Sequence, residues 1–344
     1  MKSAELAFSR PSQLSAGRPP EERGIARDGV RLLVTSASTV HHARFTDLPS
    51  FLTPGDLLVV NESRTLPASL PAEGRWGRFL INVSTSYGRG LFLVEPRWSP
   101  STPGPVPIAG GDVARVGGSQ LRFLVPYPGL PRLWFVRCEG DLAREMDRVG
   151  RPIRYGYLDG PRPLTDYQTI FARVPGSAEM PSAGRPFSHR LLRELEERGI
   201  RHVPIVLHCG VSSLEVETEE VERQPMYPEP FEVPEATARA IAETREGGHR
   251  VIAVGTTVVR ALESAWEGGA VRPMQGFTRR FVGPGAPTHV VDGLVTGLHD
   301  SRSSHLALLY GLAGVEPIRR AYDAAVAGGY LWHEFGDAHL VLNR

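Results

Sequence analysis

The sequence predicts an α/β protein whose parallel or barrel-like α/β core is accompanied by a module of short β-strands. Strands and helices alternate after Arg151, which is typical of such a core. Between about Pro67 and Val149 this alternation is absent, and Gly, Pro and Ser instead separate many short apolar runs that are typical of β-strands. The chain has 344 residues, of which 41% are hydrophobic and 22% charged, as expected for a folded globular protein.

The first half of the chain alternates polar connections with short apolar runs. The first twenty-five residues are polar and proline-rich, which predicts an extended arm. Residues 31–34 and 56–60 are predicted as buried strands, and residues 41–55 as a turn-rich connection between them. The runs RFLINVS, LFLVEP, LRFLV and LWFVRCEG predict a small antiparallel barrel or sandwich, followed by the helical stretch DLAREMDRVG.

The second half carries helix boundaries that can be read locally. Ser188 precedes a pattern of leucines and Gly199 ends it, as a serine N-cap and a glycine stop would. The same reasoning predicts helices at residues 188–199, 234–248, 256–269, 301–314 and 317–329, and strands at 202–210, 250–255, 288–299 and 336–342.

Charge and cysteine content narrow the class of protein. The net charge is +1, so bulk charge indicates neither a nucleic-acid binder nor a membrane-surface binder, although a local basic face remains open. Cys138 and Cys209 are too few for a disulfide framework or a zinc cluster, which fits a reducing compartment. No signal peptide and no run of roughly 18 apolar residues is recognised, so a cytoplasmic protein is expected.

Polar residues follow three predicted strands, at the edge where ligands bind in α/β cores. They are His208-Cys209-Gly210, Gly255-Thr256-Thr257 and Gly297-Leu298-His299-Asp300. A threonine at the second corner can cap the following helix, worth about 1 kcal/mol, and the same helix start can attract an anion. Two histidines at one edge of the sheet leave a functional site and packing residues as equal alternatives.

Several stretches together resemble one family. They are DLPSFLTPGDLLVVNESR, YQTIFARVPGS, PSAG, LHCG, RVIAVGTTVVRALES, GFTRRFVGPG, VVDGLVTGLH and GDAHLV, and they cover most of the chain in order. The sequence is similar to the S-adenosylmethionine:tRNA ribosyltransferase-isomerases of the queuosine pathway. This resemblance implies a discontinuous catalytic core, residues 1–66 and 151–344, with a small β-barrel inserted at residues 67–150.

The resemblance also implies a reaction and a site. The ribosyl part of S-adenosylmethionine would be transferred to 7-aminomethyl-7-deazaguanine in tRNA, giving epoxyqueuosine, adenine and methionine, with no metal and no membrane. The expected acid-base residues are His299, His208 and Asp337. Donor binding is expected from Gly255, Thr256, Thr257, Asn61, Ser63 and Asp292, and substrate binding from Arg64, Glu229 and Arg260. Asp292 and Asp337 could equally be turn residues beside glycine.

The sequence also departs from the family pattern. Two usual histidines are replaced by Pro186 and Tyr227, an asparagine and a phenylalanine by Gly297 and Leu298, and a proline-rich stretch by RPIRYGYLDGP. Two alternatives follow: a relative that uses the same donor with another acceptor, and a non-catalytic binder. A rival from another class is an OB-like nucleic-acid binder in which Trp76, Tyr87, Phe92 and Trp98 stack on bases rather than fill the core.

Overall fold

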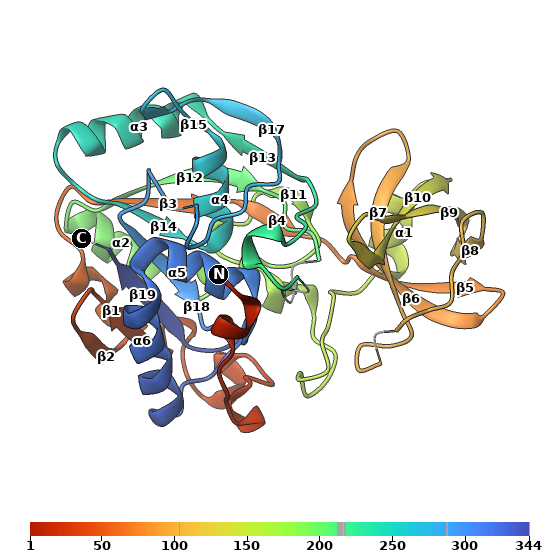
Figure 1. Ribbon diagram of the computed structural model, residues 1–344, viewed down its shortest axis with the longest axis horizontal. Helices are drawn as coiled ribbons and strands as arrows, with labels where there is room; N and C mark the ends of the chain where they lie inside the picture. Colours follow the sequence, from red (N-terminus) through yellow and green to blue (C-terminus); the bar gives the residue numbers. More distant parts are fainter. Residues whose placement is uncertain (103, 212–215, 217, 287, 344) are drawn as a thin grey trace.

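The chain forms a large α/β core and a smaller β-barrel that lies to one side of it (Figure 1). This computed structural model describes residues 1–102, 104–211, 216, 218–286 and 288–343. The predicted fold class is confirmed, because a large mixed sheet with helices is joined to a closed antiparallel barrel.

The core is built on a nine-stranded sheet with the order β17-β13-β12-β3-β14-β18-β19-β1-β2. Its central neighbours β12, β3, β14 and β18 run parallel, whereas β13, β17, β19 and β2 introduce antiparallel pairs. The strands are β1 (Arg31–Thr35), β2 (Val40–Arg44), β3 (Leu57–Asn61), β12 (Arg201–Leu207), β13 (Glu229–Val233), β14 (Val251–Val254), β17 (Met274–Thr278), β18 (Gly293–Gly297) and β19 (Ala338–Leu342).

Both faces of the sheet are covered, which explains why its central strands are apolar without alternation. On β3, Leu57 and Val59 join one apolar cluster while Leu58 and Val60 join the other, as the two-residue period of a strand requires. Four helices contribute to the first cluster and α2 to the second. The core helices are α2 (His189–Glu197), α3 (Glu235–Glu246), α4 (Thr256–Ser264), α5 (Ser304–Ala313) and α6 (Val315–Ala327).

The barrel closes in the strand order β10-β7-β6-β5-β8-β9, so none of these strands is left as an open edge. Its strands are β5 (Ser69–Gly74), β6 (Gly77–Ser86), β7 (Leu91–Arg97), β8 (Val113–Val116), β9 (Ser119–Tyr127) and β10 (Leu130–Glu139), and α1 (Leu142–Val149) follows. Trp76, Phe92 and Trp98 pack against the apolar interior of the barrel, and Tyr87 packs beside Tyr227 of the core. These contacts favour the packing interpretation of the aromatic residues.

The barrel contacts the core through the stretch that precedes β13. The hydroxyl of Tyr127 donates to the carbonyl of Met226 at 3.2 Å, and that of Tyr87 donates to the carbonyl of Pro228 at 3.1 Å. Near the connection, β4 (Ser63–Thr65) pairs in parallel with β11 (Val174–Ser177). The two connections between core and barrel therefore lie beside each other.

Three sequence expectations need correction. The stretch 41–55 was expected to lack strands, but it contains β2 at the sheet edge and a 3₁₀ helix. The helix expected at 256–269 ends at Ser264, because Trp266–Glu267 pairs with Ala270–Val271 in a short hairpin, β15 and β16. The strand expected at 288–299 begins only at Gly293, because the Asp292 carboxylate accepts a hydrogen bond from the Val251 N–H at 3.0 Å and sets the entry into β18.

Short 3₁₀ helices occupy the N-terminal arm and several of the connections between strands and helices. They are η1 (Ser3–Leu6), η2 (Ser12–Leu14), η3 (Pro20–Arg23), η4 (Arg27–Gly29), η5 (Phe45–Phe51), η6 (Leu164–Tyr167), η7 (Ser182–Gly184) and η8 (Val221–Arg223). The arm lies across the core rather than extending from it, and the Ala16 N–H donates to the Trp332 carbonyl at 3.2 Å. Among the described residues, no helix has the length and apolar character needed to cross a bilayer.

Candidate active site

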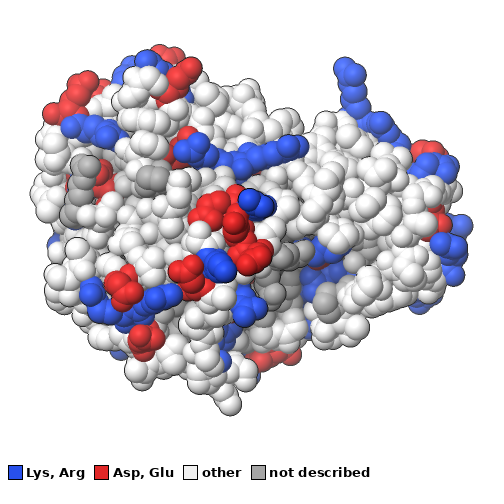
Figure 2. All heavy atoms as spheres, in the orientation of Figure 1, with Lys and Arg blue, Asp and Glu red and all other residues white. Residues whose placement is uncertain are grey.

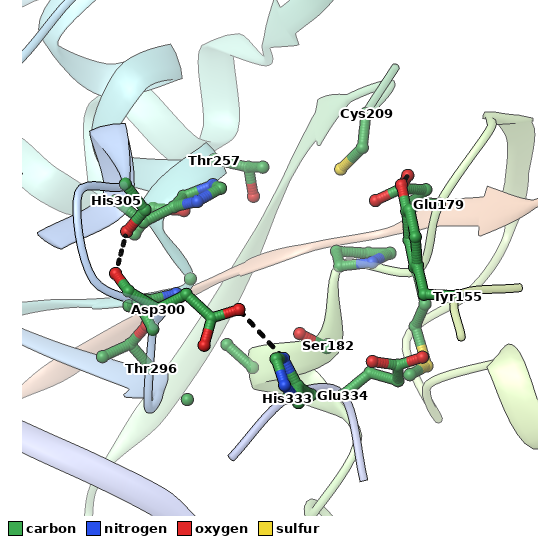
Figure 3. Close-up of a pocket in the computed structure, with 18 of the residues that line it drawn as sticks. Tyr155, Glu179, Ser182, Cys209, Thr257, Thr296, Asp300, His305, His333 and Glu334 are labelled. Carbon is green, nitrogen blue, oxygen red and sulfur yellow. Dashed lines mark hydrogen bonds and ion pairs between the residues drawn. The ribbon is translucent and has the colours of Figure 1, made fainter. Parts of the chain in front are cut away.

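A cavity of about 270 Å³ lies where three core strands end. Cys209 follows β12, Gly255 follows β14 and His299 follows β18, and all three line it. Figure 3 shows side chains from these strand ends facing others from the connection after the barrel and from the segment before β19. The prediction that the polar strand ends meet at one site is confirmed.

The Gly-Thr-Thr corner begins α4, but a threonine is not its cap. Gly255 is the N-cap, with φ of +102°, a conformation that glycine adopts without strain. The expectation of a threonine N-cap was therefore wrong, because Thr256 and Thr257 are already the first helical residues. Both line the cavity, at the end of the helix whose first N–H groups lack intrahelical acceptors. Asn61 donates to the Thr257 hydroxyl at 3.3 Å and to the Leu207 carbonyl at 2.8 Å, which ties β3 to this corner.

Arg260 lies one helical turn after Thr256 and brings a guanidinium, paired with a carboxylate, to this end of the cavity. Its guanidinium pairs with the buried carboxylate of Glu229 and donates to the Arg280 carbonyl at 3.0 Å. Glu229 also accepts a hydrogen bond from the Gly210 N–H at 2.7 Å. Within the described part of the chain, the buried Nη2 of Arg260 has no acceptor.

Two stacked histidines lie next to this end of the cavity. The rings of His299 and His305 have centroids 4.9 Å apart and planes 17° apart, and Nε2 of His299 lies 2.8 Å from the Thr296 hydroxyl. Burial holds the pKa of His299 well below its usual range and lowers that of His305 to about 4. The positive charge of Arg260 also lowers the pKa of His305. Both imidazoles are therefore uncharged near neutral pH, as a proton acceptor requires.

The opposite wall combines aromatic rings with carboxylates. Tyr157 stacks on His333 with centroids 3.9 Å apart, and Tyr155 continues the stack at 6.1 Å. The hydroxyl of Tyr155 donates to Glu179, and that of Tyr157 donates to Glu334. Burial raises the pKa of the Glu334 carboxyl group, so its neutral form is more stable than that of an exposed glutamate. These five residues are called the aromatic–acidic wall below.

Sequence reasoning missed the aromatic–acidic wall. Its residues lie in irregular connections, where no helical or strand period marks an inward face. One signal was available, because Tyr155 and Tyr157 belong to the RPIRYGYLDGP stretch in which the sequence departs from the resembled pattern. His333 and Glu334 lie just before the GDAH motif, separated from it by Phe335, and that motif predicted a role only for Asp337.

Comparison with known proteins assigns the family. The family described as "Queuosine biosynthesis protein" matches residues 3–341. The chain belongs to this family. It is 37% identical to the S-adenosylmethionine:tRNA ribosyltransferase-isomerase of Anaeromyxobacter sp. (strain K), with 100% of both chains covered. It is 38% identical to the enzyme of the same name from Thermus thermophilus, covering 94% of this chain and 97% of that one.

A solved structure carries the same likeness. The crystal structure of S-adenosylmethionine tRNA ribosyltransferase from Thermotoga maritima matches with a TM-score of 0.54 and 28% identity. The match covers 98% of this chain and 100% of that one. The resemblance of this sequence to the queuosine biosynthesis family is therefore confirmed over nearly the whole chain.

Several of the residues expected to act in this family member lie behind the cavity rather than on its surface. Nδ1 of His208 is 2.7 Å from the Ser63 hydroxyl, which is 2.6 Å from the Ser177 hydroxyl. The Ser177 hydroxyl in turn accepts from the Cys209 N–H at 2.9 Å. His208, Ser63 and Asn61 are not among the cavity-lining residues and instead hold the strand ends that form it.

The two aspartates expected at the site instead accept backbone hydrogen bonds next to strands of the sheet. Asp292 bonds to the Val251 N–H at the entry of β14, the opposite end of that strand from Gly255. Asp337 accepts from the backbone N–H of Arg31 at 2.9 Å and from that of Leu331 at 2.8 Å, and it pairs with the Arg31 guanidinium. Neither lines the cavity, so their roles in binding or catalysis stay predictions.

The remaining expected residues divide between the cavity and its surroundings. Gly255, Thr256, Thr257, Glu229, Arg260 and His299 line the cavity. Arg64 is exposed and lines a separate hollow between α1 and the chain that returns from the barrel.

The departures from the family pattern divide in the same way. Gly297 and Leu298 line the cavity, so these replacements change its surface. Pro186 lies outside it. The buried Tyr227 donates its hydroxyl to the Val211 carbonyl at 2.5 Å, where core and barrel meet. It lines a smaller hollow of about 30 Å³ that shares Arg260 and His305 with the main cavity.

Proposed function

We propose that this chain transfers the ribosyl part of S-adenosylmethionine to 7-aminomethyl-7-deazaguanine in tRNA and isomerises it, giving epoxyqueuosine with release of adenine and methionine. Its family and the name shared by its full-length relatives support this activity. The geometric observation that carries it is one cavity in which Arg260 and the start of α4 adjoin two uncharged histidines. A sulfonium donor with a carboxylate tail needs both.

The end of the cavity formed by Arg260 and the start of α4 suits the methionine part of the donor. A carboxylate placed there would lie beside the guanidinium of Arg260, whose Nη2 has no acceptor among the described residues. It would also lie at the start of α4, where the helix dipole and the first N–H groups stabilise negative charge. Thr256 and Thr257 add hydroxyls to the same corner. We assign these residues to donor binding.

The histidine pair suits proton transfer. The sulfonium of the donor acidifies the neighbouring C5′–H, so a base must take that proton as the ribosyl group rearranges. His299 lines the cavity with an uncharged imidazole, and a positioned base of this kind contributes roughly 10²–10⁴ in rate. His305 stacks on it and restricts its orientation. We assign the base to His299 and a supporting role to His305.

The residues behind the cavity fit positioning roles. His208, through Ser63 and Ser177, fixes the segment after β12, and Asn61 fixes the start of α4 through Thr257. Asp337 holds the turn at Leu331, just before the His333 and Glu334 of the aromatic–acidic wall. A contribution of these residues to activity would then act through the cavity residues that they hold.

The acceptor would approach where core and barrel meet. We propose that residues 67–150 form an inserted domain and that tRNA contacts both parts in the cytoplasm. Figure 2 shows basic and acidic side chains together on this face of the molecule, including the region where core and barrel meet. An RNA contact with few arginines would give only a shallow dependence of affinity on salt.

One experiment tests the proposed function. The chain is incubated with S-adenosylmethionine and an anticodon stem-loop that carries 7-aminomethyl-7-deazaguanine, and adenine, methionine and modified RNA are measured by mass spectrometry. Equal amounts of all three products are expected. Adenine release that requires another acceptor would favour a relative with changed acceptor specificity, for which the cavity-lining Gly297 and Leu298 are the candidate cause. Donor binding without any release would favour a non-catalytic binder.

A further inference from the structure

The aromatic–acidic wall makes the two ends of the cavity chemically different. Glu179 and Glu334 line it, as does the more exposed Asp300, whereas Arg260 and the start of α4 lie at the other end. In Figure 3, Glu179 and Tyr155 stand on the side of the cavity away from Thr257 and His305. A ligand that spans the cavity therefore meets the Arg260–Glu229 ion pair and the start of α4 at one end, and the carboxyl groups of the aromatic–acidic wall at the other.

The carboxylate of Glu179 is held by a chain of contacts that begins in the barrel. Arg97 of β7 is buried and pairs with the buried Glu95 at 3.1 Å. The guanidinium carbon of Arg97 lies 5.3 Å from the centre of the Tyr155 ring, and Tyr155 donates to Glu179. The stack on Tyr157 fixes the same ring from another side. Such prior ordering lowers the entropy that a bound ligand must otherwise remove.

The position of Glu179 in the cavity indicates which positively charged group of the substrates would lie next to it. Tyr155 lies in the connection that returns from the barrel to the core, so this side of the cavity is built by the chain that leads from the barrel. We have proposed that the tRNA approaches where core and barrel meet. The methionine end of the donor is assigned to the opposite side, beside Arg260. The acceptor base carries a primary aminomethyl group, which is protonated at neutral pH like the amine of lysine.

We propose that Glu179, positioned by Tyr155, binds the protonated aminomethyl group of the acceptor base and so determines acceptor specificity. This inference rests on the proposed function, because it takes the acceptor from that reaction. Glu334 is the less suited carboxyl group, since it lies with Tyr157 and His333 beside the N-terminal arm. The ring stack holds the carboxylates in place, and the charge of Glu179 provides the recognition.

The test compares two anticodon stem-loops that differ in one group. One carries 7-aminomethyl-7-deazaguanine and the other 7-methyl-7-deazaguanine, which lacks the charged amine. Dissociation constants are measured for wild type, Glu179→Gln, Tyr155→Phe and the control Glu246→Gln. Glu246 is exposed at the end of α3, so its substitution removes the same charge far from the cavity lining. The ratio of the two constants isolates the pairing from any general effect of a substitution on folding.

Wild type and Glu246→Gln should bind the aminomethyl RNA about 10- to 100-fold more tightly than the methyl RNA, as a charge-assisted hydrogen bond predicts. Glu179→Gln should bring the ratio close to one, and Tyr155→Phe should lower it partly. A ratio that Glu179→Gln leaves unchanged, or a wild type without preference, would overturn the inference. Preference for the amine without adenine release would instead refute the proposed function and leave the recognition intact.

Discussion

Nη2 of Arg10 donates a hydrogen bond to Nε2 of His333, and the two atoms lie 2.8 Å apart. A guanidinium has no acceptor, so this nitrogen of His333 carries a lone pair and the ring is uncharged. Arg10 also pairs with Asp300 at 2.7 Å and lies over the ring of Trp332. A residue near the start of the chain thus holds two side chains that line the cavity.

Replacing Arg10 by Met should therefore impair the site more than the fold. Loss of these charged hydrogen bonds should raise the KM of at least one of the two substrates about 10-fold, because His333 and Asp300 are no longer held by Arg10. The matched control is Arg18→Met, since Arg18 belongs to the same arm and forms an exposed pair with Asp159. Steady-state kinetics and thermal unfolding distinguish the two effects. Equal kinetic constants in both variants would exclude a role for the arm in the site.

Replacing His299 by Ala should lower turnover about 10²- to 10⁴-fold, because the proposed base is lost. Donor affinity should change little, since a group that acts in the transition state contributes to kcat more than to binding. Single-turnover adenine release and calorimetric donor binding measure the two quantities separately. If donor affinity falls while turnover of the bound donor persists, His299 is a binding residue.

The rate should also remain high in mildly acidic solution. A histidine base must be uncharged, and burial keeps the pKa of His299 well below 6.5 and that of His305 near 4. As pH falls, kcat/KM should therefore decline only below pH 6.5, once these depressed pKa values are approached. A profile of kcat/KM against pH, measured where the fold is intact, checks this. An acid limb centred near 6.5 or above would assign the proton transfer to a histidine with an ordinary pKa.

Replacing Arg260 by Gln should weaken donor binding about 10- to 100-fold, because the donor carboxylate loses a charged partner. Decarboxylated S-adenosylmethionine provides the sharper comparison, since it lacks the group that Arg260 would bind. Wild type should prefer the complete donor, and Arg260→Gln should lose that preference. The control Arg272→Gln removes an exposed arginine outside the cavity lining. An undiminished preference in Arg260→Gln would remove Arg260 from the donor site.

The stability of the fold should decline in acid through His339. This side chain is fully buried, its Nε2 lies 2.8 Å from the Thr35 hydroxyl, and burial lowers its pKa to about 3. The unfolded chain takes up the proton near pH 6.5 and the folded chain does not, so stability falls as pH drops below 6.5. Between pH 7 and pH 5 the loss should be about 2 kcal/mol.

Urea unfolding of wild type and His339→Met at pH 7 and pH 5 measures this loss. The methionine variant should lose about 2 kcal/mol less over that interval, because it has no buried imidazole to protonate at this position. Other buried histidines contribute to the decline in both proteins and cancel in the comparison. The same decline in both would assign the acid sensitivity to those other groups.

The strands and helices of the core were predictable because local chemistry specifies them. Ser188 caps α2, as expected from the leucine pattern after it, and accepts from the Leu191 N–H at 3.1 Å. The apolar runs of β3 and β14 mark strands covered on both faces. The edge strand β2 was missed, because its side chains are largely exposed and carry no apolar alternation.

By itself, the sequence determined the fold class, the meeting of three polar strand ends and the family, since apolar periodicity and contiguous motifs lie within short stretches of chain. Only the tertiary structure decided which side chains reach the cavity. Asp292 and His208 stand beside motif residues yet face the sheet and its supporting hydroxyls, whereas Tyr155, Glu179 and His333 meet from three separate connections. In such connections the direction of a side chain is set by long-range packing, which a local pattern does not encode.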